Sequence, residues 1–149
     1  LLILSSKTDP DSYPYSEVLV DAINREEPRA KARAARAKNI DRCYNLILTN
    51  QMQFMLLPRQ TTNAMRENTG QFSDREALPI KTMYEFGNLV LSVRSDMEDN
   101  IVRVVTYSIL EQLDKLPNAS NPEEMLKIDS VHGESLTAIR KFLAEHRKS

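Results

Sequence analysis

Basic side chains are concentrated in one short stretch of the sequence. Residues 29–38 hold five bases, five alanines and no acid, the bases being Arg29, Lys31, Arg33, Arg36 and Lys38. Alanine favours a helix, which would place Arg29, Arg33 and Arg36 on one face and the two lysines on the opposite one. Such a helix buries little surface. We therefore expect it to be either a solvated end or an element that contacts an acidic protein or nucleic-acid phosphates.

The overall charge bears on which of these ligands is favoured. The chain has 20 basic and 21 acidic side chains, so a net charge of −1 provides no general field that attracts a polyanion. The basic run also lacks an aromatic residue that could stack on bases. Protein binding is therefore our first hypothesis, and phosphate contact through Arg29, Arg33 and Arg36 is the alternative.

Groups that could support catalysis or hold a metal ion are sparse. The two histidines, His132 and His146, have no serine, cysteine and carboxylate set close to them in sequence, and no glycine-rich phosphate loop occurs. The spacing of Asp129 and His132 would place two metal ligands on one helix face, but the other half of such a site is missing. We predict no enzymatic activity, no catalytic residue, no metal site and no cofactor.

The single cysteine, Cys43, bears on the compartment. It cannot form an internal disulfide, which favours a reducing environment, the cytoplasm or the nucleus. Its apolar neighbours predict a buried thiol that packs as a small hydrophobic side chain. Leu1–Leu4 is too short to span a membrane, so no membrane partner is expected.

Apolar residues dominate the stretch after the basic run. Between Ile40 and Leu57 they are spread around most of the circumference of a helix, which predicts a central and largely buried helix. Met52 and Met55 have a second interpretation as an apolar groove for a partner, because methionine adapts to varied shapes. Core packing is the favoured interpretation of the two.

The elements that position these residues are all expected to be helices. Only three glycines occur, good helix formers are abundant, and apolar residues recur at intervals of three and four. The fold class predicted is all-α, a bundle of about four main helices with two long helices and short connecting helices. The main helices would span residues 17–25, 28–57, 79–116 and 130–147. Residues 1–16 would form an irregular N-terminal arm, and residues 17–149 the bundle domain.

These expectations combine into a functional hypothesis. The chain would be a protein-interaction or scaffold domain of a larger intracellular assembly. Its partner would be another protein chain, acidic or helical, bound through the basic run or through Met52 and Met55, with nucleic acid as the alternative ligand. The oligomeric state and the identity of the partner do not follow from the sequence.

Overall fold

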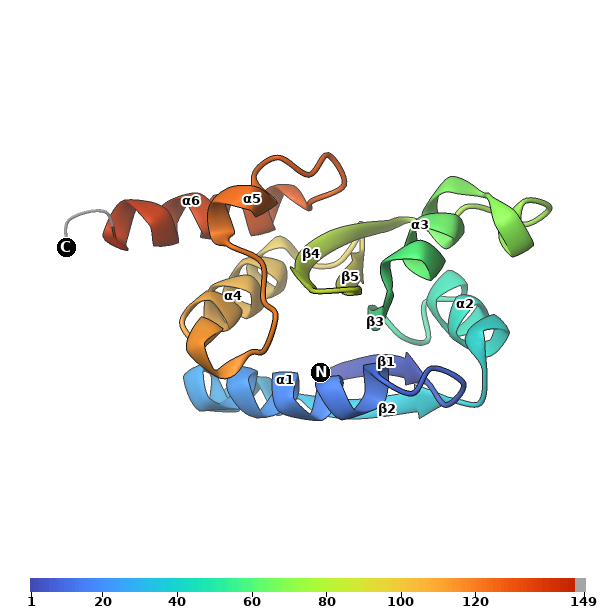
Figure 1. Cartoon of the computed structure of the whole chain (residues 1–149), viewed down its shortest axis with the longest axis horizontal. Coiled ribbons are helices and arrows are strands. Elements are labelled where there is room, and N and C mark those ends of the chain that lie inside the picture. The colour runs from blue at the N-terminus through green and yellow to red at the C-terminus, as the bar shows by residue number, and fades with distance from the viewer. Residues whose placement is uncertain (147–149) are drawn as a thin grey trace.

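A five-stranded sheet lies at the centre of the protein, for which a computed structural model describes residues 1–146 (Figure 1). In chain order the strands are β1 (Leu2–Ser6), β2 (Arg33–Ala37), β3 (Phe54–Pro58), β4 (Ile80–Phe86) and β5 (Leu89–Arg94). Their order in space is β2-β1-β3-β5-β4. β5 pairs antiparallel with both of its neighbours, whereas β1 pairs parallel with β2 and with β3. The prediction of an all-α bundle is therefore wrong, and the fold is mixed α/β.

Helices cover both faces of this sheet. They are α1 (Ser12–Glu26), α2 (Ile40–Leu48), α3 (Arg59–Glu67), α4 (Asp99–Leu110), α5 (Pro122–Met125) and α6 (Gly133–His146). Short 3-10 turns are η1 (Pro28–Ala30), η2 (Gly70–Phe72) and η3 (Leu113–Lys115). The expected helix 17–25 lies within α1, and the expected helix 130–147 contains α6, although residue 147 lies outside the described residues.

The core is divided by the sheet into two clusters. On one face, side chains from α1, α4 and α6 pack with inward residues of the strands, among them Ile23, Phe54, Val105 and Ile139. On the other face, α2 and α3 contribute Cys43, Ile47 and Met65 to a second cluster. Figure 1 shows this separation, with α4 and α6 to the left of the sheet and α2 and α3 to the right. Within residues 1–146, no helix combines the length and the apolar composition needed to cross a membrane.

The long helix expected over residues 28–57 is absent. This stretch instead forms η1, β2, α2 and β3 in succession. Lys31 and Asn50 adopt left-handed backbone conformations, with φ of 47° and 62°, which an α-helix does not contain. The apolar residues of β3 are buried because a central strand is covered on both faces, and this produces a continuous apolar run without alternation.

The long helix expected over residues 79–116 is also wrong. Its first half is the β4–β5 hairpin, and its second half contains α4. Met83, Phe86, Val90 and Val93, which recur at intervals of three and four, are buried, but they lie on strands. The hairpin turns at Gly87, whose φ of 61° suits a residue without a side chain.

Residues 1–16, expected to form an irregular arm, contain β1 and the start of α1. β1 is central to the sheet: Leu2 to Ser6 pair with Arg33 to Ala37 on one side, and Ile3 and Leu4 pair with Phe54 and Met55 on the other. The first strand of the chain therefore lies between β2 and β3 and pairs in parallel with both of them.

Candidate functional site

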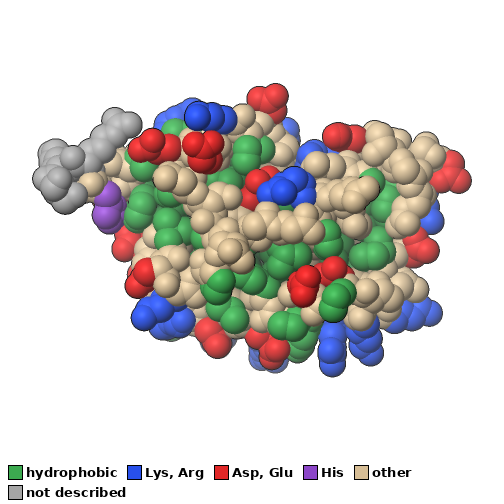
Figure 2. All heavy atoms as spheres, in the orientation of Figure 1, with side chains coloured by type: hydrophobic (Ala, Val, Ile, Leu, Met, Phe, Trp, Pro, Cys, Tyr) green, Lys and Arg blue, Asp and Glu red, His purple; other side chains and the backbone are tan. Residues whose placement is uncertain are grey.

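The basic run lies along one edge of the sheet and not on a helix. Arg29 belongs to η1, Lys31 follows it, Arg33 and Arg36 lie in β2, and Lys38 comes directly after β2. All five residues are exposed. Figure 2 shows Lys and Arg side chains gathered at the lower right of the molecule, where Figure 1 places β2. The expected helical rod of charge is thus corrected to an extended basic strand, because pairing with β1 outweighs the helix propensity of alanine.

The backbone of β2 is unpaired on its outer side. The N–H of Arg33 donates to the Leu1 carbonyl, and the Ala37 carbonyl accepts from the Lys7 N–H, both at 2.8 Å. Because backbone groups alternate along a strand, Ala34 and Arg36 direct their N–H and C=O groups away from β1. Among the described residues, none of these four groups has a hydrogen-bond partner. We call residues 33–38, with these outward groups, the open edge.

Asn24 closes the amino end of this edge. Its side-chain Nδ2 donates to the Ala32 carbonyl at 2.9 Å, and its Oδ1 accepts from the Ala32 N–H at 2.8 Å. The amide of Asn24 therefore makes the two hydrogen bonds that a neighbouring strand would make at that position. Unpaired backbone begins only at Ala34.

The opposite edge of the sheet, at β4, is covered. The N–H of Thr82 donates to Ser130, and its carbonyl accepts from His132, both at 2.8 Å. Further along β4, the carbonyl of Glu85 accepts from the Ser120 N–H at 3.0 Å. The segment 118–132 thus shields β4, as proteins commonly shield sheet edges, while β2 is protected only by its charges.

Ion pairing is sparse along the basic run within residues 1–146. Within the described part of the chain, no ion pair involves Lys31, Arg33, Arg36 or Lys38. Of the acids that flank the run in sequence, Glu27 pairs with Arg29 and Asp41 pairs outside the run. Arg29 hydrogen-bonds to Glu27 at 2.9 Å, which lowers the pKa of that carboxyl, and Asp41 pairs with Arg75 at 2.9 Å. The positive charge of β2 is therefore available to a ligand.

Arg36 is held in a defined position despite its exposure. Its guanidinium carbon lies 4.4 Å from the centre of the Tyr13 ring on α1, a cation–π contact. A guanidinium stacked on a ring still presents its in-plane N–H groups, which match a carboxylate or a phosphate. Arg36 therefore lies on the α1 face of the sheet. By strand alternation, Arg33 lies on the α2 face.

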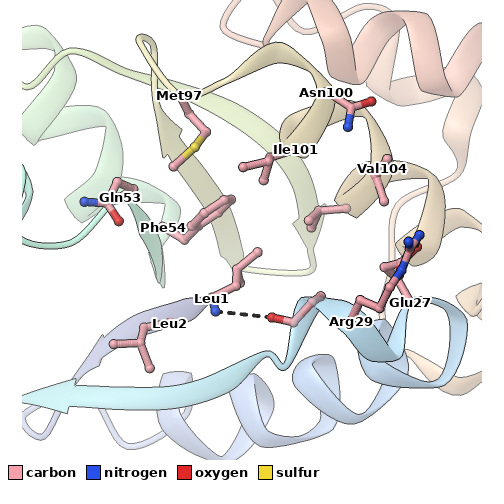
Figure 3. A pocket seen from close by; sticks show the side chains of 12 residues that line it. Leu1, Leu2, Glu27, Arg29, Gln53, Phe54, Met97, Asn100, Ile101 and Val104 are labelled. Carbon is pink, nitrogen blue, oxygen red and sulfur yellow. Dashed lines mark hydrogen bonds and ion pairs between the residues drawn. The ribbon is translucent and has the colours of Figure 1, made fainter.

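An apolar cavity of about 570 Å³ lies near Arg29, at the amino ends of β1 and β3 (Figure 3). Leu1, Phe54, Met97 and Ile101 point into it, and Arg29 and Glu27 stand together at its rim (Figure 3). Sequence reasoning missed this cavity, because its walls come from segments about 25 to 100 residues apart that only the sheet brings together. Arg29 is the one residue of the basic run that lines it.

Met52 and Met55 occupy different environments. Met55 lies in β3 with 1% of its surface exposed, inside the cluster beneath α2. Met52 is half-buried and packs against the same cluster. The two side chains therefore do not form one surface groove, since Met55 does not reach the surface.

Cys43 and His132, the other candidates for chemistry, are both buried and hydrogen-bonded. Burial raises the pKa of the Cys43 thiol to about 12, and the thiol contacts the Ser5 carbonyl. His132 is 8% exposed, and its Nδ1 accepts a hydrogen bond of 3.0 Å from the Glu134 N–H at the start of α6. Within residues 1–146, no group of three His, Cys, Asp or Glu side chains could hold a metal ion.

Comparison with known proteins adds no further constraint. No protein-family model matches the chain, and no curated protein has a similar sequence. The functional interpretation therefore depends on the geometry of the open edge and of its surroundings.

Proposed function

We propose that this domain binds an extended acidic segment of another protein, which joins the sheet as a sixth strand beside β2. The observation that supports this most directly is the open edge, where Ala34 and Arg36 direct unpaired N–H and C=O groups outward. In strand addition, main-chain hydrogen bonds give affinity and side-chain contacts give specificity. The unpaired cations Arg33, Arg36 and Lys38 favour an acidic guest.

A peptide suits this edge better than the other candidate occupants. Nucleic-acid phosphates could neutralise the arginines, but they only accept hydrogen bonds and would leave the Ala34 and Arg36 carbonyls unpaired. A second copy of this chain would bring an equal set of cations against the first, and like charges oppose such pairing. An acidic strand satisfies both the backbone and the charges.

The biological role that fits this binding mode is that of an interaction or scaffold domain. We place it in the cytoplasm or the nucleus, where a single buried thiol such as Cys43 needs no disulfide partner. We propose no catalytic step.

The binding mode can be tested by NMR with the isotope-labelled chain. The probe is a ten-residue peptide with the sequence Thr-Thr-Glu-Val-Val-Glu-Thr-Glu-Thr-Thr, used together with its reversed sequence. We expect chemical-shift changes centred on β2 and slower hydrogen exchange of the Ala34 and Arg36 amides. A peptide with lysine in place of glutamate is the charge control. An N-methylated version, which cannot donate backbone hydrogen bonds at alternate residues, is the backbone control.

Two protein variants complete this test. Arg33→Glu combined with Arg36→Glu should weaken binding by at least about tenfold, since two attractive charges become repulsive. Lys115→Glu combined with Arg140→Glu makes the same change in net charge at exposed residues outside β2, and should bind like the original chain. Equal binding of the N-methylated peptide, or binding of a single-stranded oligonucleotide in place of the peptides, would contradict strand addition.

A further inference from the structure

We infer that the open edge selects segments with two acidic residues three positions apart, two apolar residues between them, and a third acidic residue two positions further on. This inference rests on the proposed strand addition and specifies the guest. It follows from which face of the sheet each β2 side chain occupies and from the size of that side chain.

The spacing of the acids follows from the spacing of the cations. Residues directly opposite each other on paired strands project on the same face of a sheet. Arg33 projects on the α2 face and Arg36 on the α1 face, so their partners are three positions apart and on opposite faces of the guest. Lys38 is exposed directly after β2, two positions beyond Arg36, and it places the third acid.

The apolar pair follows from the two alanines between the arginines. Ala34 and Ala35 are only half-buried, and their methyl groups leave space where larger side chains of a neighbouring strand would lie, about 4.5–5.5 Å away between Cβ atoms. On the α2 face this space adjoins Leu2, which pairs with Arg33 and is 45% exposed. A valine or a larger apolar residue opposite each alanine would bury these surfaces.

Asn24 fixes the register of the guest. Because its amide already occupies the N–H and C=O of Ala32, a guest strand cannot slide toward the amino end of β2 without breaking two hydrogen bonds. A slip of one residue would also move every guest side chain to the other face, placing acids opposite alanines. Pairing is therefore confined to the stretch that begins at Arg33, in which two consecutive alanines separate the two arginines.

The pattern can be separated from general acidity with a permuted peptide. Thr-Val-Thr-Glu-Glu-Glu-Thr-Val-Thr-Thr has the composition of the patterned probe but clusters its acids. We expect the better of the patterned peptide and its reversed sequence to bind about tenfold more tightly than the permuted one by isothermal titration calorimetry, from several cross-strand pairs acting together. If the permuted peptide binds equally well, the pattern is wrong and strand addition stands. If no peptide binds, the proposed function itself is wrong.

Paired charge reversals in the protein and in the peptide identify the peptide residue that lies opposite each arginine of β2. Arg33→Glu should weaken binding of the patterned peptide, and replacing one glutamate of the peptide with lysine should restore it. Binding to the Arg36→Glu variant should be restored by lysine at a second glutamate, three positions from the one that restores binding to Arg33→Glu. If this second position lies toward the carboxyl end of the peptide, the guest runs parallel to β2, and if it lies toward the amino end, the guest runs antiparallel. Restoration at positions with any other spacing, or at every glutamate equally, would refute the predicted pattern.

Discussion

His132 provides a test of how a single buried imidazole contributes to folding stability. It is the residue before α6, and its carbonyl accepts from the Leu136 N–H at 3.0 Å while its Nδ1 accepts from the Glu134 N–H. The imidazole therefore caps the helix, a task that requires Nδ1 to be unprotonated. Burial lowers the pKa of His132, Lys81 lowers it further, and Asp99 and Glu134 oppose the shift.

The sign of the pH dependence follows from this lowered pKa. In the unfolded chain the histidine titrates at its ordinary pKa of about 6.5, whereas the folded state resists protonation. The unfolded state therefore binds more protons as the pH falls from about 7, and stability decreases until the folded pKa is passed. Loss of the cap costs about 1 kcal/mol, within a range of roughly 0.5–2. In a domain of this size, that lowers Tm by about 2–4 °C.

Thermal and urea unfolding between pH 8 and pH 5 would measure this contribution. His132→Asn keeps a capping oxygen but cannot titrate in this range, so we expect a smaller loss of stability on acidification than in the original chain. His146→Asn is the matched control, because His146 is exposed near the end of α6. The reasoning is refuted if His132→Asn leaves the pH dependence unchanged, or if His146→Asn abolishes it.

Three further outcomes follow from the structure. Phe54→Ala should cost about 2–5 kcal/mol in the free energy of unfolding, measured with urea, because Phe54 is 3% exposed in a central strand; a loss below about 1 kcal/mol would contradict its role in the core. Arg33→Ala combined with Arg36→Ala should change Tm little but increase self-association in light scattering, since the charges that separate open edges are removed; an unchanged scattering signal would argue against such protection. The Cys43 thiol, with its pKa raised to about 12, should react with a disulfide reagent at pH 8 only as fast as the chain opens, and rapid reaction of the native protein would contradict its burial.

Some features of the fold are readable in the sequence because they depend on local signals. α6 lies within the helix expected over residues 130–147. Asn121 before Pro122 is a local start signal for α5, and the Asn121 side chain accepts from the Glu123 N–H at 2.9 Å. The burial of Cys43, Ile47 and Phe54 was expected as well, since apolar composition indicates a core whatever the secondary structure.

The strands were missed because their signals depend on tertiary structure. Residues 33–37 are alanine and arginine, which favour a helix in isolation and form β2 only because β1 offers a pairing edge. In β4, a register shift between Thr82 and Tyr84 disturbs the alternation, and β5 is buried at five consecutive positions, so neither strand shows a regular two-residue period. Gly87 followed by Asn88 was the one local hairpin signal in that stretch.

For the basic run, amino-acid composition predicts the exposure of the side chains but not the pairing of the backbone. Its five cations are exposed, as a sequence without acids or large apolar residues predicts. The outward N–H and C=O groups of Ala34 and Arg36, however, depend on which strands flank β2. Strand order is set by contacts between distant residues, which periodicity in one segment does not report.

The covering of β4 by residues 118–132 has a consequence for biosynthesis. β4 leaves the ribosome well before the segment that pairs with its outer edge, so a growing chain has an unprotected edge at β4 as well as at β2. The β4–β5 hairpin can form early from local contacts. Residues 118–132, which cover its outer edge, are synthesised only after most of the described chain. A chain that terminates before Ser120 would keep this second edge open permanently, and it would be prone to pair with other nascent chains.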